Sequence, residues 1–267
     1  MTYYTRPFFL LLFFNVAWGQ TLKATYSLDF IFNEKTPHKI SKEKFSLLIY
    51  DTSESVFLST PALHNDSLLK SMENLPYSKN GISNIKSPLI KTHFQTIITK
   101  NYTNKLVKVY DTIFTLKGNY LFNEKLNWEI KDSTAKIGEY NCILAQVFYA
   151  GRNYEAWFTD EIPISDGPYL FSGLPGLIVE VSDARKNYHF KLLSFEKNNS
   201  KKINHFYISK KSIQFDRTEF LNLRLSHHND PIGFMANTLN IKGLDEDVQS
   251  DIKKNISKRN NFMELNW

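Results

Sequence analysis

Residues Tyr140–Thr159 read YNCILAQVFYAGRNYEAWFT, and this stretch decides the fold class. The segment Tyr140–Tyr149 carries apolar side chains on both faces when extended, which predicts a strand covered on both sides. Ala150–Asn153 then supply a hairpin turn, because glycine and asparagine accept positive φ. The remainder, from Tyr154 onward, predicts a second strand that returns beside the first.

Alternation of apolar and polar residues predicts further strands on both sides of this hairpin. They are Tyr26–Phe32, Phe45–Tyr50, Val56–Leu58, Phe94–Thr99, Leu106–Tyr110, Asn127–Lys131, Leu177–Val181 and Tyr188–Phe195. Short strands joined by tight turns predict a mainly β protein, with a single domain over residues 20–267. The expected architecture is an antiparallel curved sheet, a sandwich or an open half barrel.

Two helices are expected. A short one at Asp66–Leu75 interrupts the otherwise polar stretch Asn65–Lys91. The other lies near residues 244–258, where Leu244, Val248, Ile252 and Ile256 recur every four residues. Acidic residues stand at its front and lysines at its end, the order that a helix dipole favours. Its narrow apolar stripe predicts a helix on the surface.

Residues 1–19 are expected to be a secretory signal peptide. Arg6 precedes the apolar run Phe8–Phe14, and Ala17 and Gly19 place small residues before the expected cleavage site. The run is shorter than the roughly 20 apolar residues that cross a membrane. We therefore expect a periplasmic or secreted protein that is not transmembrane after signal removal.

The composition excludes several classes of protein. A single cysteine among 267 residues excludes an internal disulfide framework, and an aromatic content of 15% argues against disorder. The 33 Lys and Arg exceed the 27 Asp and Glu only mildly, without a basic cluster. Nucleic acid is therefore not an expected partner.

The connection Asp160–Gly176 is stiff and apolar. Pro175 and Gly176 suit the two central positions of a type II turn, the second of which needs positive φ. The loop also carries the apolar residues Tyr169, Leu170, Phe171 and Leu174. These side chains are expected to pack against another apolar surface. One interpretation is that the loop plugs an end or open face of the sheet. The other is a binding edge formed by Trp157, Tyr169, Leu170, Phe171 and Leu174.

A series of short motifs occurs in order between Trp128 and Asp183. Its residues are Cys142, Gly151, Arg152, Trp157, Pro163, Gly167, Pro168, Gly173, Leu174, Pro175, Gly176, Leu177 and Ile178. With its intact Gly-Leu-Pro-Gly-Leu-Ile hexapeptide, this series resembles the GLPGLI family of bacterial proteins. The resemblance implies export, a β-rich domain and a possible outer-membrane transport partner. It implies no activity, cofactor or catalytic residue.

A cysteine, an arginine and a pair of adjacent histidines are candidates for chemistry. Cys142 is expected to be a core thiol rather than a nucleophile, because it lies in the middle of a strand. Arg152 is expected to pair with Asp160 or Glu161. The adjacent His227 and His228 would point to opposite faces of a strand, which makes a poor metal chelate even with Asp230 nearby.

No hydrolase elbow, zinc-protease pair, phosphate loop or dinucleotide motif occurs in the sequence. We therefore expect an exported, non-enzymatic envelope protein without metal or cofactor. It would be a binding or accessory module for a hydrophobic ligand, a peptide or an outer-membrane partner. The alternative is an envelope hydrolase that uses Asp160, Glu161 or Asp166, which would require these carboxylates to converge in a cleft.

Overall fold

The computed structural model describes residues 21–73, 89–198 and 212–264. The expected signal peptide, residues 1–19, lies outside these ranges, and so do the last residues of the helix expected at Asp66–Leu75. Within the described ranges, no helix is both long enough and apolar enough to cross a membrane.

The described residues contain twelve strands in one sheet. They are β1 Thr21–Phe30, β2 Ser41–Tyr50, β3 Glu54–Ser59, β4 Ile97–Asn101, β5 Leu106–Ile113, β6 Leu116–Phe122, β7 Glu129–Ile137, β8 Tyr140–Tyr149, β9 Arg152–Thr159, β10 Leu177–Asp183, β11 Tyr188–Asn198 and β12 Ile213–Gln214. Their spatial order is β12-β6-β5-β4-β3-β2-β1-β11-β10-β9-β8-β7. Neighbours are antiparallel except β12 and β6, which run parallel.

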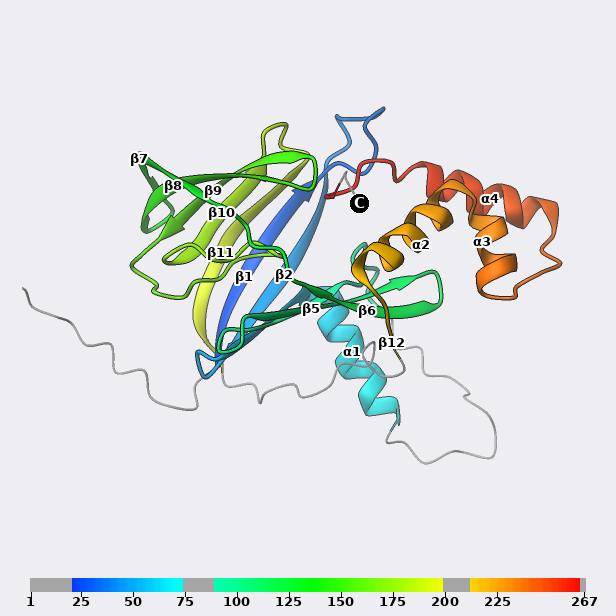
Figure 1. The fold of residues 1–267 in the computed structure, drawn as a ribbon, viewed down its shortest axis with the longest axis horizontal. Helices are drawn as coiled ribbons and strands as arrows, with labels where there is room; N and C mark the ends of the chain where they lie inside the picture. Colours follow the sequence, from blue (N-terminus) through cyan, green and yellow to red (C-terminus); the bar gives the residue numbers. More distant parts are fainter. Residues whose placement is uncertain (1–20, 74–88, 199–211, 265–267) are drawn as a thin grey trace, which may run out of the picture.

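The sheet is open and strongly curved, as Figure 1 shows. Strand β1 lies at its centre, between the run β2–β6 and the run β7–β11. Its alternating residues Tyr26, Leu28 and Phe30 are fully buried in the main core. Burial of each such side chain contributes roughly 1.5–3 kcal/mol. The expected mainly β, open antiparallel architecture is confirmed.

Four helices lie within the described residues: α1 Thr60–Glu73, α2 Arg217–Asn229, α3 Pro231–Thr238 and α4 Glu246–Ser257. Helix α4 confirms the helix expected near 244–258, and none of its residues is buried. Helix α1 begins earlier than expected, at Thr60. Figure 1 shows α2, α3 and α4 grouped at one side of the sheet, from which the chain returns toward β1 and β2.

Helices α2 and α3 were not expected, although the sequence carries their start signals. Asp216 accepts a hydrogen bond from the Thr218 N–H at 2.8 Å, and Glu219 completes a capping-box spacing. Asp230 likewise accepts from the Gly233 N–H at 3.0 Å, with Pro231 at the first turn. His227 and His228 therefore lie on a helix, and the expected strand there is wrong.

Strand β8 is buried on one face and only partly covered on the other. Ala145, Val147 and Tyr149 are buried, but Phe148 between them is 67% exposed. The expectation of a strand covered on both sides therefore holds at Cys142, which is 1% exposed, and fails at Phe148 on the same face. Apolar residues on both faces did not distinguish a buried strand from one with an exposed aromatic residue.

The turn before β10 also differs from the expected type II turn. The Gly176 N–H donates to the Leu174 carbonyl at 2.8 Å, which makes a three-residue turn centred on Pro175. Gly176 does not have positive φ; that conformation belongs to Gly173, at φ +96°. Position 176 instead requires glycine because the backbone packs closely there: a Cβ would lie 2.0 Å from the Thr159 carbonyl oxygen.

Candidate functional site

Residues 160–176, here called the bridging loop, span the concave side of the sheet. The loop leaves β9 and enters β10, yet its Asp166 contacts Ser55 of β3 and Lys100 of β4. Strands β9 and β10 lie in the opposite half of the sheet from β3 and β4. The loop therefore ties the two halves together across the concavity.

The apolar side chains of the bridging loop form core rather than an exposed edge. Leu170, Phe171 and Leu174 are 2%, 0% and 1% exposed, and the Phe171 ring lies 4.7 Å from that of Tyr154. The binding edge expected at these three residues is wrong, since they already pack against the sheet. The interpretation of the loop as a plug fits this burial. Tyr169 is half-buried and lines a cavity described below.

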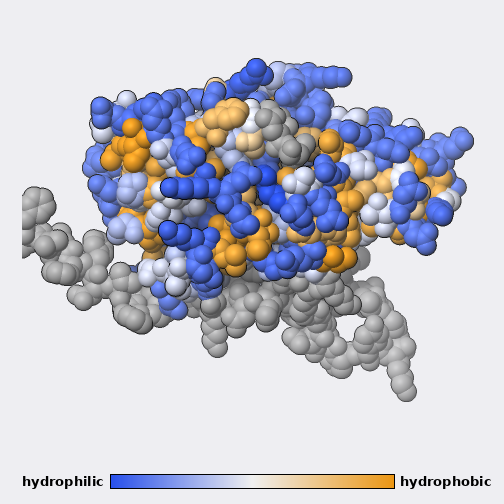
Figure 2. All heavy atoms as spheres, in the orientation of Figure 1, coloured by the Kyte–Doolittle hydropathy of each residue, from blue (hydrophilic) through white to orange (hydrophobic). Residues whose placement is uncertain are grey.

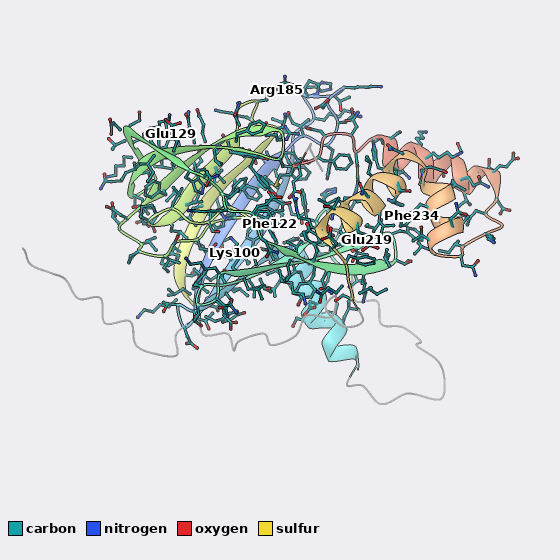
Figure 3. The ribbon with its side chains drawn as sticks, viewed as in Figure 1. Lys100, Phe122, Glu129, Arg185, Glu219 and Phe234 are labelled. Carbon is teal, nitrogen blue, oxygen red and sulfur yellow. The ribbon has the colours of Figure 1, made fainter. Side chains whose placement is uncertain are left out.

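Asp166 is the anchor of the bridging loop. Its carboxylate is fully buried and accepts hydrogen bonds from Ser55, Lys100 and Tyr102, each at 2.5 Å. The Lys100 ammonium, seen on β4 in Figure 3, also donates to the Gly167 carbonyl at 2.9 Å. Burial lowers the pKa of Lys100, while Asp166 opposes that shift. These contacts give Asp166 a structural role.

The three loop carboxylates do not converge. Asp160 is exposed, and Glu161 accepts hydrogen bonds from the backbone and side chain of Asn141, both at 2.9 Å. Asp166 is fully buried. The arrangement that the hydrolase alternative requires, a shared cleft, is therefore not formed by these residues.

Residues 260–264, here called the C-terminal strap, lie extended against the concave face. Three side chains of the sheet donate to three consecutive strap carbonyls: Tyr188 to Asn261 at 2.5 Å, Arg152 to Phe262 at 2.6 Å and Tyr154 to Met263 at 2.8 Å. The backbone of the strap is thus held by side chains rather than by a strand ladder.

The end of the strap is anchored by a buried carboxylate. Glu264 is 3% exposed and accepts hydrogen bonds from Tyr149 at 2.8 Å and Tyr169 at 2.6 Å. Arg217 of α2 pairs with its second oxygen at 3.2 Å. Burial, followed by the Glu264 charge, raises the pKa of both tyrosines, so they stay protonated as donors.

Arg152 joins the strap to the sheet instead of pairing with the bridging loop. It is 6% exposed, forms a salt bridge with Asp183 at 3.2 Å and donates to Asn261 Oδ1 at 2.5 Å. The expected pairing with Asp160 or Glu161 is wrong. Strand β9 begins at Arg152, directly after the turn Ala150–Gly151. Because β9 pairs antiparallel with β10, the end of β10 at Asp183 lies near Arg152.

A cavity of about 210 Å³, here called the aromatic chamber, lies between the concave face and the strap. Its phenylalanine and tyrosine lining consists of Phe32, Phe45, Phe57, Phe94, Tyr169, Tyr188, Phe190 and Phe262, and its charged lining of Asp111, Arg224, Arg259 and Glu264. The rings of Phe45 and Phe57 stack at 5.1 Å, and Phe190 meets both edge-on. Phe262 and Met263 of the strap form part of the wall.

The chamber adjoins a larger hollow of about 1050 Å³, here called the cationic groove. The residues that line both spaces are Phe32, His93, Gln95, Arg224, Arg259 and Phe262. The cationic residues along the groove are Lys39, Lys91, Arg224, Lys258 and Arg259. The mainly apolar chamber and the charged groove therefore adjoin and share these six residues.

Burial holds the pKa of each groove histidine below its usual value. Burial is the largest cause that lowers the pKa of His93; Glu43 opposes it, while Arg259 and Lys91 lower it further. Burial also lowers the pKa of His227 and of His228. The lysines and arginines thus carry the charge of the groove.

No group of three His, Cys, Asp or Glu side chains in the described ranges could hold a metal ion. His227 packs against Phe234, and His228 packs against Phe262. Asp230 caps α3. His227, His228 and Asp230 therefore have other contacts, and they lie on or beside helices rather than on a strand.

Cys142 is expected to be unreactive in the folded protein. The thiol is 1% exposed, and burial raises its pKa to about 11. Because the thiolate is the reactive form, a disulfide reagent at mildly alkaline pH should label native protein far more slowly than denatured protein. Equal labelling rates for the native and urea-denatured protein would contradict the burial of this thiol.

Comparisons with known proteins give a family match and a shared fold. Residues 149–180 match a family described as a protein of unknown function (Porph_ging). These residues cover β9, the bridging loop and most of β10, within the stretch that resembles the GLPGLI family; that resemblance stays a prediction. No curated protein matches the chain.

Two crystal structures of PNGF-II share the fold. The P21 form has a TM-score of 0.53 at 14% identity and covers 76% of this chain and 32% of PNGF-II. The C2 form has a TM-score of 0.53 at 14% identity and covers 78% and 33%. The chain thus spans about one third of PNGF-II. The LolA superfamily protein NE2245 from Nitrosomonas europaea matches with a TM-score of 0.27 at 7% identity, over 68% of this chain and 88% of that protein.

Proposed function

We propose that this protein is an exported, non-enzymatic binding module of the cell envelope that binds an apolar ligand in the aromatic chamber. The observation that carries the proposal is the chamber itself, a space of about 210 Å³ with aromatic rings along much of its lining, which adjoins a larger groove. Asp111, Arg224, Arg259 and Glu264 also line it. Apolar surface moved from water into such a space contributes roughly 25 cal/mol per Å². Export rests on residues 1–19 of the sequence.

The contacts of the chemically interesting groups support a role without catalysis. Asp166 anchors the bridging loop, Glu161 holds Asn141, and Cys142 is buried. Each group has a structural task, and none of the three lines the aromatic chamber. The chamber is therefore supported as a place to hold a ligand.

On the face shown in Figure 2, an internal ligand is favoured over docking through a broad apolar surface. The face shown in Figure 2 is mostly hydrophilic, with separate apolar patches rather than one continuous area. Trp157, expected on a binding edge, is half-buried and lines neither the chamber nor the groove. The proposal also includes an accessory role, in which the protein binds a peptide or an outer-membrane transport protein.

The proposal predicts that a neutral apolar fluorophore, N-phenylnaphthylamine, binds the mature protein saturably with increased emission. Gln95 lies at the junction of chamber and groove and is exposed, so Gln95→Trp obstructs the entrance without overfilling the core. We expect this substitution to weaken binding about tenfold, or 1.4 kcal/mol. Fluorescence titration measures the dissociation constant.

Phe148→Ser is the matched control, because Phe148 is a 67% exposed aromatic residue on β8, away from the chamber lining. It should leave the titration unchanged. Loss of binding in Phe148→Ser but not in Gln95→Trp would place the fluorophore on the outer surface and overturn the proposal. Circular dichroism confirms that both variants fold.

A further inference from the structure

The lining of the cationic groove is unbalanced in charge. It contains Lys39, Lys91, Arg224, Lys258 and Arg259, and no carboxylate occurs among the described residues that line it. Like charges gathered along a hollow raise the local potential and attract anions. The imbalance is therefore a recognition feature of the groove.

Most of these cations have no carboxylate partner of their own. Arg224 pairs with Asp111, but Lys39, Lys91 and Arg259 form no ion pair within residues 21–73, 89–198 and 212–264. Glu43 is the carboxylate near His93, and it already accepts hydrogen bonds from Thr92 at 2.6 Å and from the His93 N–H at 2.8 Å. Uncompensated positive charge thus faces the groove.

The position of Arg259 connects this charge to the chamber. Its guanidinium lies 5.1 Å from the centre of the Phe32 ring, and both residues line the chamber as well as the groove. A ligand whose apolar chain lies among the rings of Phe45, Phe57 and Phe190 would therefore present its other end to Arg259.

We propose that the ligand is a single-chain amphiphile with an anionic head group, a carboxylate or a phosphate. This inference rests on the proposed function, because it places the apolar chain in the aromatic chamber. The head group lies in the cationic groove, where Arg259 and Lys91 attract it. A guanidinium suits both oxyanions, because its N–H groups match their paired oxygens.

Isothermal titration calorimetry with three probes tests the inference. Dodecanoate supplies chain and charge, the glycerol monoester of dodecanoic acid supplies the chain without charge, and inorganic phosphate supplies charge without a chain. We expect dodecanoate to bind about tenfold more tightly than the monoester. Its affinity should fall with added salt, while that of the monoester stays constant. Phosphate alone should not saturate.

Two exposed cations provide the variants. Arg259→Glu and Lys91→Glu should each reduce the affinity for dodecanoate to that for the monoester, without weakening the monoester. Lys136→Glu makes the same charge change on the exposed edge strand β7, outside the groove, and should leave both affinities unchanged. If Lys136→Glu weakened dodecanoate binding as much as the groove variants do, the effect would come from the net charge of the protein. That result would overturn the inference.

The outcomes separate the inference from the proposed function. If dodecanoate and the monoester bound with equal affinity, the proposal of an anionic head group would be wrong. The proposal that the chamber binds an apolar chain would still stand. Saturable phosphate binding as tight as that of dodecanoate would show a site for free anions and contradict the amphiphile. Failure of both chain-bearing probes to bind would remove the proposed function as well.

Discussion

Asp166→Ala is expected to lower the free energy of unfolding by about 3–5 kcal/mol. The substitution removes the carboxylate that lies 2.5 Å from the Lys100 ammonium, while that ammonium stays 3% exposed. An ammonium buried without its partner has lost hydration and gained no compensating charge. Urea unfolding followed by circular dichroism measures the difference.

Asp160→Ala is the control, because Asp160 belongs to the same loop and is exposed. Its effect should stay within about 0.5 kcal/mol. The double variant Asp166→Ala with Lys100→Met should recover part of the lost stability, since it leaves no unpaired ion. If Asp166→Ala costs less than about 1 kcal/mol, as an exposed ion pair would, the bridging loop is not anchored as described.

Arg152→Met is expected to cost about 3–5 kcal/mol and to loosen the C-terminal strap. The substitution leaves Asp183 buried without its 3.2 Å salt bridge and removes the donor to the Phe262 carbonyl. The amides of Asn260 and Asn261, which donate to the Phe32 carbonyl at 3.1 Å, should then exchange faster. Urea unfolding and hydrogen exchange followed by mass spectrometry measure the two effects.

Arg185→Met is the matched control. Arg185 lies on the exposed turn between β10 and β11, at the top of Figure 3, and should leave stability and strap exchange unchanged. A normal exchange rate at Asn260 and Asn261 in a folded Arg152→Met protein would show that the other strap contacts suffice. The strap would then not depend on this arginine.

The strands could be predicted because burial on the concave face is periodic. Tyr26, Leu28 and Phe30 alternate with less buried residues along β1, and this pattern survives in the fold. Helix α3 has only eight residues, and α2 buries only Phe220 and Leu221, so neither gives the long apolar stripe that predicts a helix. The N-cap residue Asp216 is a better predictor of α2, because an N-cap marks where a helix begins whichever face of the helix is buried.

The site could not be predicted from local patterns, because its residues meet only in three dimensions. Phe57, Phe190 and Met263 come from β3, β11 and the strap, far apart in the sequence. The sequence marks Asp166 only as one of three loop carboxylates, yet its partner Lys100 lies 66 residues away. Only the register of the sheet brings such pairs together, and alternation alone does not specify register.

A crystal structure of the mature protein with bound dodecanoate tests the central claim most directly. The account predicts the chain between the rings of Phe45, Phe57 and Phe190, with its carboxylate at the groove beside Arg259. If the chamber stays empty in crystals grown with saturating ligand, or if the chain lies on the outer face of the sheet, the claim that the concave face is the binding site is wrong.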